Sequence, residues 1–265
     1  MPRVRAGDDD VAIRCTDLSV ARASTRGGGS QRVVDGLTFT VGRARTLAVF
    51  GPTGAGKSSL VAVLAGADET GLAIVGGEAL VDGTPVRRAG RSHRRLTFVT
   101  GYLPQGEGAK LPARLTVAEV IGSPITSRDR RANPRALAVR VATLLDELAL
   151  PLGASAKYPY ELSAGMRQRV ALARALVLQP KILVADEPFA NLDVEARQAV
   201  RDAILRRRDG YGMSTLMVTS DREAIGELDA DVLVMRSGHA VAFGHGTGDL
   251  LWTPSSEADR RLVAS

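Results

Sequence analysis

The stretch from residue 51 to residue 58 reads Gly51-Pro52-Thr53-Gly54-Ala55-Gly56-Lys57-Ser58. It follows a short apolar run, Thr46 to Phe50, which is typical of a buried parallel strand, and residues 58–64 continue at helical spacing. Glycines let consecutive backbone N–H groups surround a phosphate, and the following helix directs its positive N-terminal end at the same anion. The stretch therefore predicts a strand, a phosphate-binding loop and a helix in direct succession.

The polar side chains that end this loop have distinct expected roles. We expect Lys57 to reach the β- and γ-phosphates of a nucleotide and the Ser58 hydroxyl to ligate Mg²⁺. Ser59 completes the nucleotide-binding set, which otherwise runs from Gly51 to Ser58. A glycine-rich turn that matches by chance is the alternative, but a place between a buried strand and a helix disfavours it.

A second motif ends another apolar run. Residues 182–185 read Ile-Leu-Val-Ala and lead into two carboxylates, Asp186 and Glu187. We expect Asp186 to hold Mg²⁺ through water and Glu187 to polarise an attacking water. By itself, the pair also fits an exposed acidic turn after a buried strand. Both motifs on one chain, with strands that alternate with helices, predict an α/β ATP hydrolase.

A third motif lies between the other two and reads Leu162-Ser163-Ala164-Gly165-Met166-Arg167-Gln168-Arg169. Ser163 and the backbone N–H groups after it head a helix, so they can bind a γ-phosphate. A serine N-cap before a helix is the plain alternative. Between the two other motifs, this one resembles the L-S-G-G-Q signature of ATP-binding cassette (ABC) proteins. The resemblance runs from about Ile13 to Pro254.

The resemblance implies a fold and a domain organisation. The fold is an α/β P-loop NTPase core, as in ABC ATPases, with an antiparallel β-subdomain and an inserted α-helical subdomain. Residues 1–10 are expected to be a disordered tail, and residues 11–265 a single nucleotide-binding domain. In that domain, the RecA-like core with its β-subdomain takes 11–101 and 172–265, and the helical subdomain takes 102–171.

The resemblance also assigns site residues for ATP and Mg²⁺. Gln105 matches the family's Q-loop, with a catalytic role and a place among the Mg²⁺ ligands, and Asp193 matches the D-loop that crosses a dimer interface. An exposed glutamine beside a proline and a helix N-cap are the plain alternatives. Two such chains bind two ATP molecules head to tail. Ser163 and Gly165 of one chain then grip the γ-phosphate held by the other.

A closer match lies within the family. Residues 158–170 read Y-P-Y-E-L-S-A-G-M-R-Q-R-V and look like the Y-P-H-E-L-S-G-G-M-R-Q-R-V of oligopeptide, dipeptide and nickel importer ATPases. This similarity implies peptide-type import by a peripheral subunit on the cytoplasmic face of the membrane. The implied partners are transmembrane permease subunits, a second ATPase subunit and an extracytoplasmic solute-binding protein. The cysteine cluster of many such subunits is absent, because Cys15 is the only cysteine, and this leaves the substrate open.

Two departures from the family pattern bear on the mechanism. Thr219-Ser220-Asp221 stands where the family has T-H-D, so Ser220 takes the place of the switch histidine. A serine hydroxyl is never cationic, and the loss of one stabilising donor typically costs about 10²–10³ in rate. Ala164 places a Cβ where the signature has glycine. We therefore expect a slow or silent ATP site in this chain, and a heterodimer rather than a homodimer.

Three functions stay open at this point. The first is the ATPase subunit that energises a transporter. The second is a nucleotide-binding regulatory subunit with little hydrolysis of its own, although an intact Glu187 argues against total inactivity. The third is a soluble ABC protein acting on DNA or the ribosome, which a single cassette without coiled-coil insertions or zinc motifs disfavours. An adenine-stacking aromatic residue is missing near Val20 to Ala23, and we expect Arg22 there to be solvated.

The composition excludes several other classes. Of the 265 residues, 45% are hydrophobic and 24% charged, which argues against a disordered chain. The net charge of +6 suggests nucleic acid, but 31 of the 35 basic residues are arginine. Such a ratio fits codon usage better than a binding surface, so we expect no nucleic-acid partner. No signal peptide and no stretch of about 18 apolar residues is recognisable.

Local patterns predict several further elements. Residues 11–20 alternate weakly and are expected to form an edge strand, and residues 96–99 are expected to form a strand of a small antiparallel layer. Apolar residues at helical spacing predict helices over 134–148 and 163–178.

Overall fold

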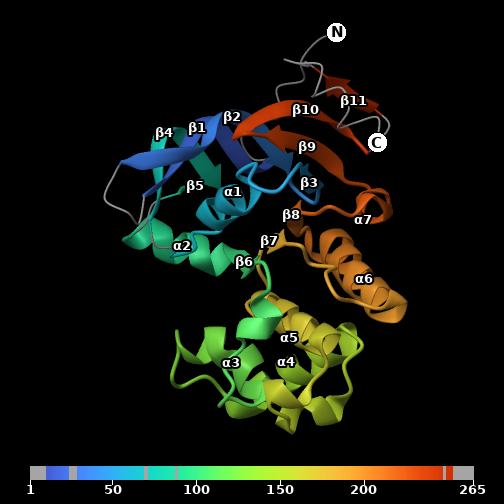
Figure 1. Ribbon diagram of the computed structural model, residues 1–265. Coiled ribbons are helices and arrows are strands. Elements are labelled where there is room, and N and C mark those ends of the chain that lie inside the picture. The colour runs from blue at the N-terminus through green and yellow to red at the C-terminus, as the bar shows by residue number, and fades with distance from the viewer. Residues whose placement is uncertain (1–9, 24–28, 69–70, 87–88, 247–248, 253–265) are drawn as a thin grey trace.

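The computed structural model describes residues 10–23, 29–68, 71–86, 89–246 and 249–252, and it is organised around two β-sheets (Figure 1). The four-stranded antiparallel sheet has the order β2 (Ser30–Gly42), β1 (Val11–Ala23), β4 (Leu72–Val81) and β5 (Thr84–Pro85). The seven-stranded sheet has the order β11 (Asp249–Trp252), β10 (His239–His245), β9 (Asp231–Arg236), β3 (Thr46–Phe50), β8 (Ser214–Val218), β7 (Ile182–Asp186) and β6 (Thr100–Leu103). Its strands from β9 to β6 are parallel, and β10 and β11 extend it as antiparallel strands.

The parallel strands are mostly buried, because helices and the second sheet cover both faces of this part of the sheet. β7 and β8 are buried at every position. In β3, alternation sends Leu47 and Val49 into the core beside α1 (Lys57–Leu64) and the antiparallel sheet, while Ala48 joins the core on the opposite face. A parallel sheet with helices on both faces confirms the predicted α/β class.

Six further α-helices lie among the described residues: α2 (Arg91–Val99), α3 (Val117–Thr126), α4 (Pro134–Glu147), α5 (Ala164–Leu176), α6 (Val194–Tyr211) and α7 (Arg222–Glu227). Helices α3, α4 and α5 gather at the lower end of the molecule, away from the antiparallel sheet (Figure 1). Short 3₁₀ helices accompany them: η2 (Glu107–Lys110), η3 (Leu152–Ala156) and η4 (Pro159–Glu161). Helices α3 and α4 and the three 3₁₀ helices lie inside the predicted helical subdomain, and α5 begins inside it. The boundaries at 102 and 171 stay predictions, because α5 runs without interruption across the second of them.

Two local predictions are wrong. Residues 11–20 form no edge strand, because β1 pairs with both β2 and β4, and register shifts along both pairings disturb its alternation. Residues 96–99 end helix α2, where Leu96 and Val99 form its buried face three positions apart, and the strand begins only at Thr100. Most of the predicted tail (1–9) lies outside the described residues.

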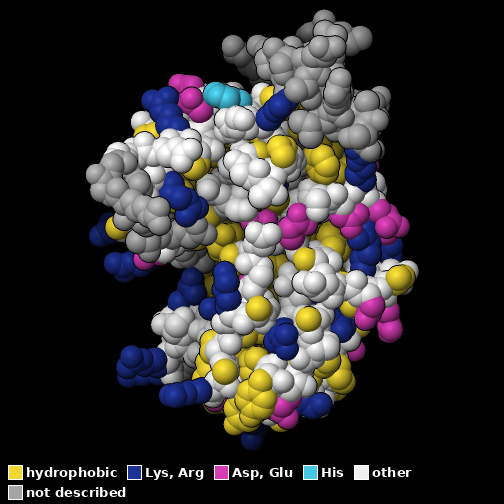
Figure 2. All heavy atoms as spheres, in the orientation of Figure 1, with side chains coloured by type: hydrophobic (Ala, Val, Ile, Leu, Met, Phe, Trp, Pro, Cys, Tyr) yellow, Lys and Arg dark blue, Asp and Glu magenta, His cyan; other side chains and the backbone are white. Residues whose placement is uncertain are grey.

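The surface carries charges of both signs. On the face shown in Figure 2, Lys and Arg side chains lie at several separate places, with Asp and Glu side chains among them. Hydrophobic side chains are exposed at the lower end of the molecule in Figure 2. Leu152 in η3 and Tyr160 in η4 are exposed, and the Tyr158 and Tyr160 rings stack with their centroids 5.5 Å apart. None of the helices in the described part of the chain combines the length and apolar character needed to cross a membrane.

Candidate functional site

The loop 51–56 joins β3 to α1, and its shape requires glycine at two positions. Gly51 has a φ of 143° and Gly56 a φ of 96°. A Cβ at Gly56 would lie 2.0 Å from the Val33 carbonyl oxygen, and one at Gly51 would lie 2.1 Å from the Met235 carbonyl oxygen. Only a residue without Cβ can bring the loop this close to the neighbouring strands. The loop is therefore held in a curve that other residue types cannot adopt.

Lys57 begins α1 and folds back over the loop. Its Nζ donates to the carbonyl oxygens of Gly51, at 2.6 Å, and of Pro52, at 2.9 Å. Burial lowers the pKa of Lys57, and the nearby carboxylates of Asp186 and Glu187 act against this shift. The lysine therefore lies in the field of both acidic residues of the second motif, while Ser58, on the same helix, is exposed.

Two carboxylates lie at the end of β7, which β8 separates from β3 in the sheet. Asp186 is the last residue of β7 and is 2% exposed, whereas Glu187 leaves the strand with a φ of 52° and is half-buried. Burial raises the pKa of the Glu187 carboxyl above its ordinary value, the Ser220 hydroxyl acts against the rise, and Asp186 adds to it. Glu187 thus has the surroundings of a proton acceptor in a partly desolvated site.

Ser220 meets Glu187 directly. Both its hydroxyl and its backbone N–H donate to the Glu187 carboxylate. The contact follows from the sheet, because β7 and β8 are parallel neighbours with Asp186 opposite Val218. The loops after these two strands therefore emerge side by side.

Gln105 lies at the same edge of the sheet, two positions after β6, and is exposed. The segment that follows it is bound to α5. A Cβ at Gly108 in η2 would lie 2.8 Å from the Gln168 backbone nitrogen, and the Glu107 carboxylate pairs with Arg174 at 2.9 Å. The loop that carries Gln105 therefore ends against the third motif's helix.

The third motif forms the start of α5, in the lower part of Figure 1. The Ser163 hydroxyl accepts the Met166 N–H at 3.1 Å and so caps the helix. A Cβ at Gly165 would lie 3.0 Å from the Asn191 carbonyl oxygen, and Gln168 Nε2 donates to the Glu187 carbonyl oxygen at 3.4 Å. The start of α5 therefore packs against the loop that follows β7.

Asp193 caps helix α6. Its Oδ1 accepts the Ala196 N–H at 2.8 Å, and the residue is exposed. The structure thus brings Lys57, Asp186, Glu187 and Ser220 together at the carboxyl edge of the sheet. Ser163 and Asp193 instead cap the starts of two helices, α5 and α6.

Three contacts of the site have no counterpart in the sequence analysis. Arg22 is exposed, as expected, but its Nη2 also donates to the Ser59 hydroxyl at 3.2 Å, so it is tied to the start of α1. Gln168 reaches Glu187, and Arg197 lies against the loop after Glu187. The one sequence feature that points to a role for Arg197 is its position four residues after Asp193, the cap of α6, which puts both on the same helical face.

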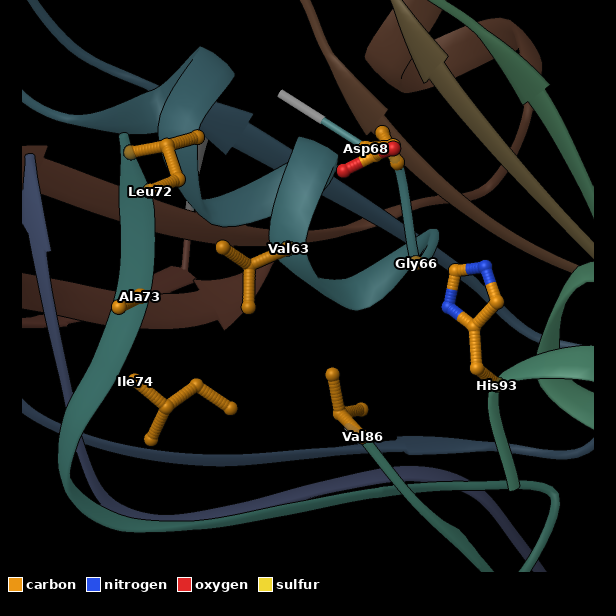
Figure 3. Close-up of a pocket in the computed structure, with 9 residues that line it drawn as sticks. Val63, Gly66, Asp68, Leu72, Ala73, Ile74, Val86 and His93 are labelled. Carbon is orange, nitrogen blue, oxygen red and sulfur yellow. The ribbon is translucent and has the colours of Figure 1, made fainter. Parts of the chain in front are cut away.

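A separate cavity of about 270 Å³ lies at the far end of α1 (Figure 3). Its walls come from α1, β4 and α2 and include Val63, Leu72, Ile74, Val86 and His93. None of the predicted site residues lines it, so it is not part of the phosphate loop.

The family model described as "ABC transporter" matches residues 34–190. The chain is 32% identical to the oligopeptide transport ATP-binding protein OppD of Mycobacterium tuberculosis, over 98% of this chain and 42% of that protein. It is 32% identical to the peptide transport system ATP-binding protein SapF of Salmonella typhimurium, over 86% and 82%. It is 37% identical to the Fe(3+) ions import ATP-binding protein FbpC of Pseudomonas fluorescens, over 82% and 58%.

The fold also matches a solved structure. A dimeric, post-hydrolysis structure of the ATP-binding cassette MJ0796 bound to ADP and Pi superposes with a TM-score of 0.77 at 20% identity, over 88% of this chain and 98% of that one. This similarity confirms the cassette fold, with its antiparallel sheet beside the parallel one. The chain spans 42% of the OppD relative and 58% of the FbpC relative.

Proposed function

This chain belongs to the ABC transporter family, and from that membership we propose that it is the ATP-hydrolysing subunit of a transporter, of the peptide-import type. One observation carries the proposal. Lys57, Asp186 and Glu187 interact at the mouth of a loop that only glycine can form. These are a cation for phosphate, a carboxylate for a metal ion and a carboxylate for water, which are the groups that phosphoryl transfer to water requires.

The loop fits a nucleotide's phosphates. Its backbone is curved by residues with positive φ, and its N–H groups precede the positive end of α1. The groups that hold ATP are the loop residues 51–56, Lys57, Ser58 and Ser59. Lys57 Nζ already binds two carbonyl oxygens, so its position suits an anionic oxygen that replaces them.

Oxygen-bearing side chains at the same edge fit Mg²⁺. They are the Ser58 hydroxyl, the Gln105 amide and the almost fully buried Asp186 carboxylate. Hydroxyl, amide and carboxylate oxygens are the ligands that Mg²⁺ prefers. When bound, the ion neutralises charge on the β- and γ-phosphate oxygens.

Glu187 is the group that takes the proton from the attacking water. The two donors of Ser220 fix one side of its carboxylate, and Gln168 fixes its backbone carbonyl. This arrangement orients the base, but Ser220 is directed at Glu187 and cannot supply the cationic donor that a histidine offers to phosphate. Hydrolysis at this site is therefore slow.

A complete site needs a second cassette. Ser163 and Gly165 head α5, so this helix start offers backbone N–H groups to the nucleotide of a facing chain. Asp193, at the start of α6, lies in the loop that crosses the interface between the two chains. Since this chain's own site is slow, the partner is a second, more active ATPase subunit. Transmembrane permease subunits and an extracytoplasmic solute-binding protein complete the assembly, with this subunit on the cytoplasmic face of the membrane.

Peptide import is the substrate class that the relatives support best. OppD and SapF are both named for peptide transport, and residues 158–170 follow the pattern of such subunits. FbpC, by contrast, is named for the import of Fe(3+) ions.

A second candidate function is a regulatory subunit that binds nucleotide with little hydrolysis. The specific observation in its favour is Ser220 in contact with Glu187, in the place of a histidine. The two candidates share the site and differ only in turnover.

The test is phosphate release from Mg²⁺-ATP by the full chain, alone and in detergent extract with co-purified subunits. We expect hydrolysis that Glu187→Gln lowers by about 10²-fold or more, with unchanged ATP affinity. ATP binding with no hydrolysis in either form supports the regulatory subunit. The proposal is overturned if Lys57→Ala binds ATP as well as wild type does and if ribosomes, instead of permeases, are recovered with the chain.

A further inference from the structure

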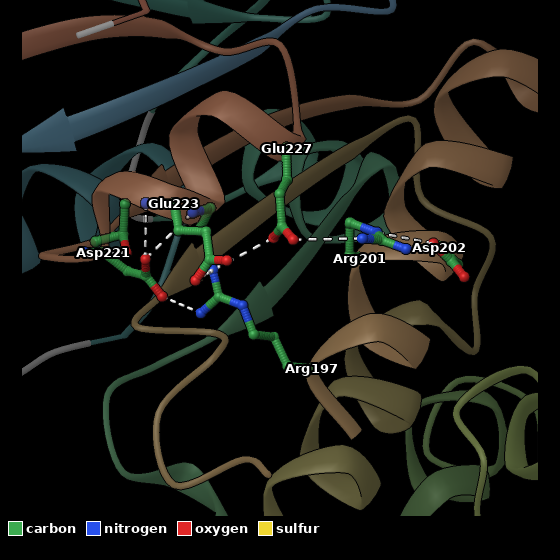
Figure 4. Close-up of polar contacts among 8 residues, drawn as sticks. Arg197, Arg201, Asp202, Asp221, Glu223 and Glu227 are labelled. Atoms are coloured by element: carbon green, nitrogen blue, oxygen red, sulfur yellow. Dashed lines mark hydrogen bonds and ion pairs between the residues drawn. The ribbon is translucent and has the colours of Figure 1, made fainter. Parts of the chain in front are cut away.

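Arg197 lies on the first turn of α6 and touches two loops at once. Its guanidinium carbon is 5.2 Å from the centroid of the Phe189 ring, and its Nη1 donates to the Asp221 carboxylate (Figure 4). Its side chain is 18% exposed. Phe189 lies two positions after Glu187, and Asp221 is next to Ser220. One side chain thus joins the segments that carry both residues.

Asp221 transmits this contact to Ser220. Its Oδ2 takes the Arg197 hydrogen bond, while its Oδ1 accepts the N–H groups of Glu223, at 3.0 Å, and Ala224, at 3.2 Å. Its own N–H donates to the Thr219 hydroxyl at 3.0 Å. Both carboxylate oxygens and the backbone N–H of Asp221 are therefore held by hydrogen bonds. Ser220, between Thr219 and Asp221, has little freedom to turn away from Glu187.

We propose that Arg197 is a positioning residue for ATP hydrolysis, which clamps Asp221 to Phe189 and thereby holds Ser220 against Glu187. The role rests on the proposed function, because Ser220 and Glu187 must act on ATP for it to matter. The clamp joins the loops after β7 and β8 at a second point, beside the Ser220–Glu187 contact itself. A serine side chain is short, so its hydroxyl reaches the carboxylate only while these loops stay together.

An arginine suits this place better than a lysine. Its planar guanidinium can lie over an aromatic face and still donate in plane to a carboxylate, and a lysine ammonium cannot do both at once. Two further carboxylates face the same group: Glu227 lies 3.3 Å and Glu223 lies 3.6 Å from Nη2. The acidic surroundings hold the cation, and the Phe189 ring sets its plane.

Arg201 provides a matched control on the same helix. It lies one turn later, pairs with Glu227 at 3.3 Å and with Asp202 at 2.8 Å, and shares the acidic cluster (Figure 4). Among the described residues, its hydrogen bonds and ion pairs go to Asp202 and Glu227 and not to Asp221. Arg201→Ala therefore removes a similar charge without opening the clamp.

The decisive experiment is a double-mutant cycle on kcat and KM for Mg²⁺-ATP in the full chain. We expect Arg197→Ala to lower kcat about tenfold and to leave KM within about twofold, because it misplaces Ser220 without touching the phosphate loop. In a Ser220→Ala background the same substitution should change kcat by less than about twofold. Arg197→Lys should fall between, and Arg201→Ala should match wild type. Equal losses in both backgrounds would overturn the role, while hydrolysis itself would still stand.

A second measurement is independent of turnover. Hydrogen exchange reports how firmly the amides of Asp221, Glu223 and Ala224 are held. Arg197→Ala and the milder Asp221→Asn, which keeps a capping oxygen, should both speed their exchange about tenfold, and Arg201→Ala should not. Unchanged exchange in both variants contradicts the clamp, even in a chain that hydrolyses no ATP.

Discussion

The Arg207 guanidinium and the Glu147 carboxylate form a bidentate ion pair. Nε lies 2.8 Å from Oε1, and Nη2 lies 2.6 Å from Oε2. Glu147 is the last residue of α4, and Arg207 belongs to α6, with side chains 14% and 11% exposed. The pair therefore ties the helical group at the lower end of the molecule to the helix that follows the active-site strand.

Glu147→Gln should destabilise the chain, because it leaves the Arg207 charge nearly buried without its partner. Loss of one member of a buried pair costs about 3–5 kcal/mol, and the slight exposure here favours the lower end, about 3 kcal/mol. Urea unfolding measures the change. Asp209→Asn, which breaks the exposed pair with Arg208 on the same helix, should cost about 0.5 kcal/mol or less. Similar midpoints for the two variants would contradict the expectation.

Ser220→His should raise ATP turnover. A histidine at this position can donate to the γ-phosphate, and one such donor is worth about 10²–10³ in rate. The check is kcat of the variant in the assembled transporter, with Ser220→Ala as the matched control. Ser220→Ala should lose about tenfold, since it removes one hydrogen bond to a charged group. No gain from the histidine would mean that this chain's site is not limited by Ser220.

Gly56→Ala should disrupt the phosphate loop. Its φ of 96° and a Cβ only 2.0 Å from the Val33 carbonyl oxygen force the backbone to move, at a cost of at least about 2 kcal/mol and with loss of ATP binding. Gly54→Ala is the control, because Gly54 also has a positive φ, 81°, but nothing lies within 4 Å of its Cβ position. It should cost about 1 kcal/mol. Thermal unfolding without ATP compares the stability of the two variants, and the shift that ATP adds tests binding by Gly56→Ala against wild type.

Asp82→Asn should make the chain less stable at neutral pH and change its acid unfolding. Burial raises the pKa of Asp82, but hydrogen bonds from Lys181 and Arg43 outweigh it and hold the pKa below the ordinary value of 3.8. A depressed pKa contributes stability that is present above the unfolded-state value and is lost as the pH falls through the folded-state value. The partners are 59% and 39% exposed, so the neutral-pH effect should be about 1 kcal/mol.

Urea titrations at pH 7 and pH 3 check this. The difference in the free energy of unfolding between wild type and Asp82→Asn should be largest at pH 7 and should shrink as the pH drops below 3.8. A gap that grows on acidification would show that the ion pairs are not its source.

The site's strands were readable from the sequence because each is an apolar run that ends in a polar motif. Continuous burial makes such runs visible without knowledge of their neighbours, and so β3 and β7 were predicted. The inner position of β1 was not, because pairing partners are set by segments far along the chain. The sequence at the end of α2 predicts a strand, since a run of four mostly apolar residues fits the helical period and the strand period equally well.

The side-chain contacts of the site were largely out of reach. Counting from Asp186 placed Ser220 in the family's switch position, but its hydrogen bonds to Glu187 depend on the neighbouring order of β7 and β8. Gln168 and Arg197 reach the Glu187 loop across 19 residues and 8 residues of chain, respectively, and no local pattern encodes such approaches. Local patterns specify elements, and tertiary packing decides what the elements touch.

The two carbonyl bonds of Lys57 make the phosphate loop self-supporting. In the proposed function, the ammonium exchanges these two backbone oxygens for phosphate oxygens when a nucleotide binds, and it returns to them when the nucleotide leaves. Nucleotide exchange at this loop is then a swap of partners around one fixed cation, and the loop has no need to refold between one ATP molecule and the next.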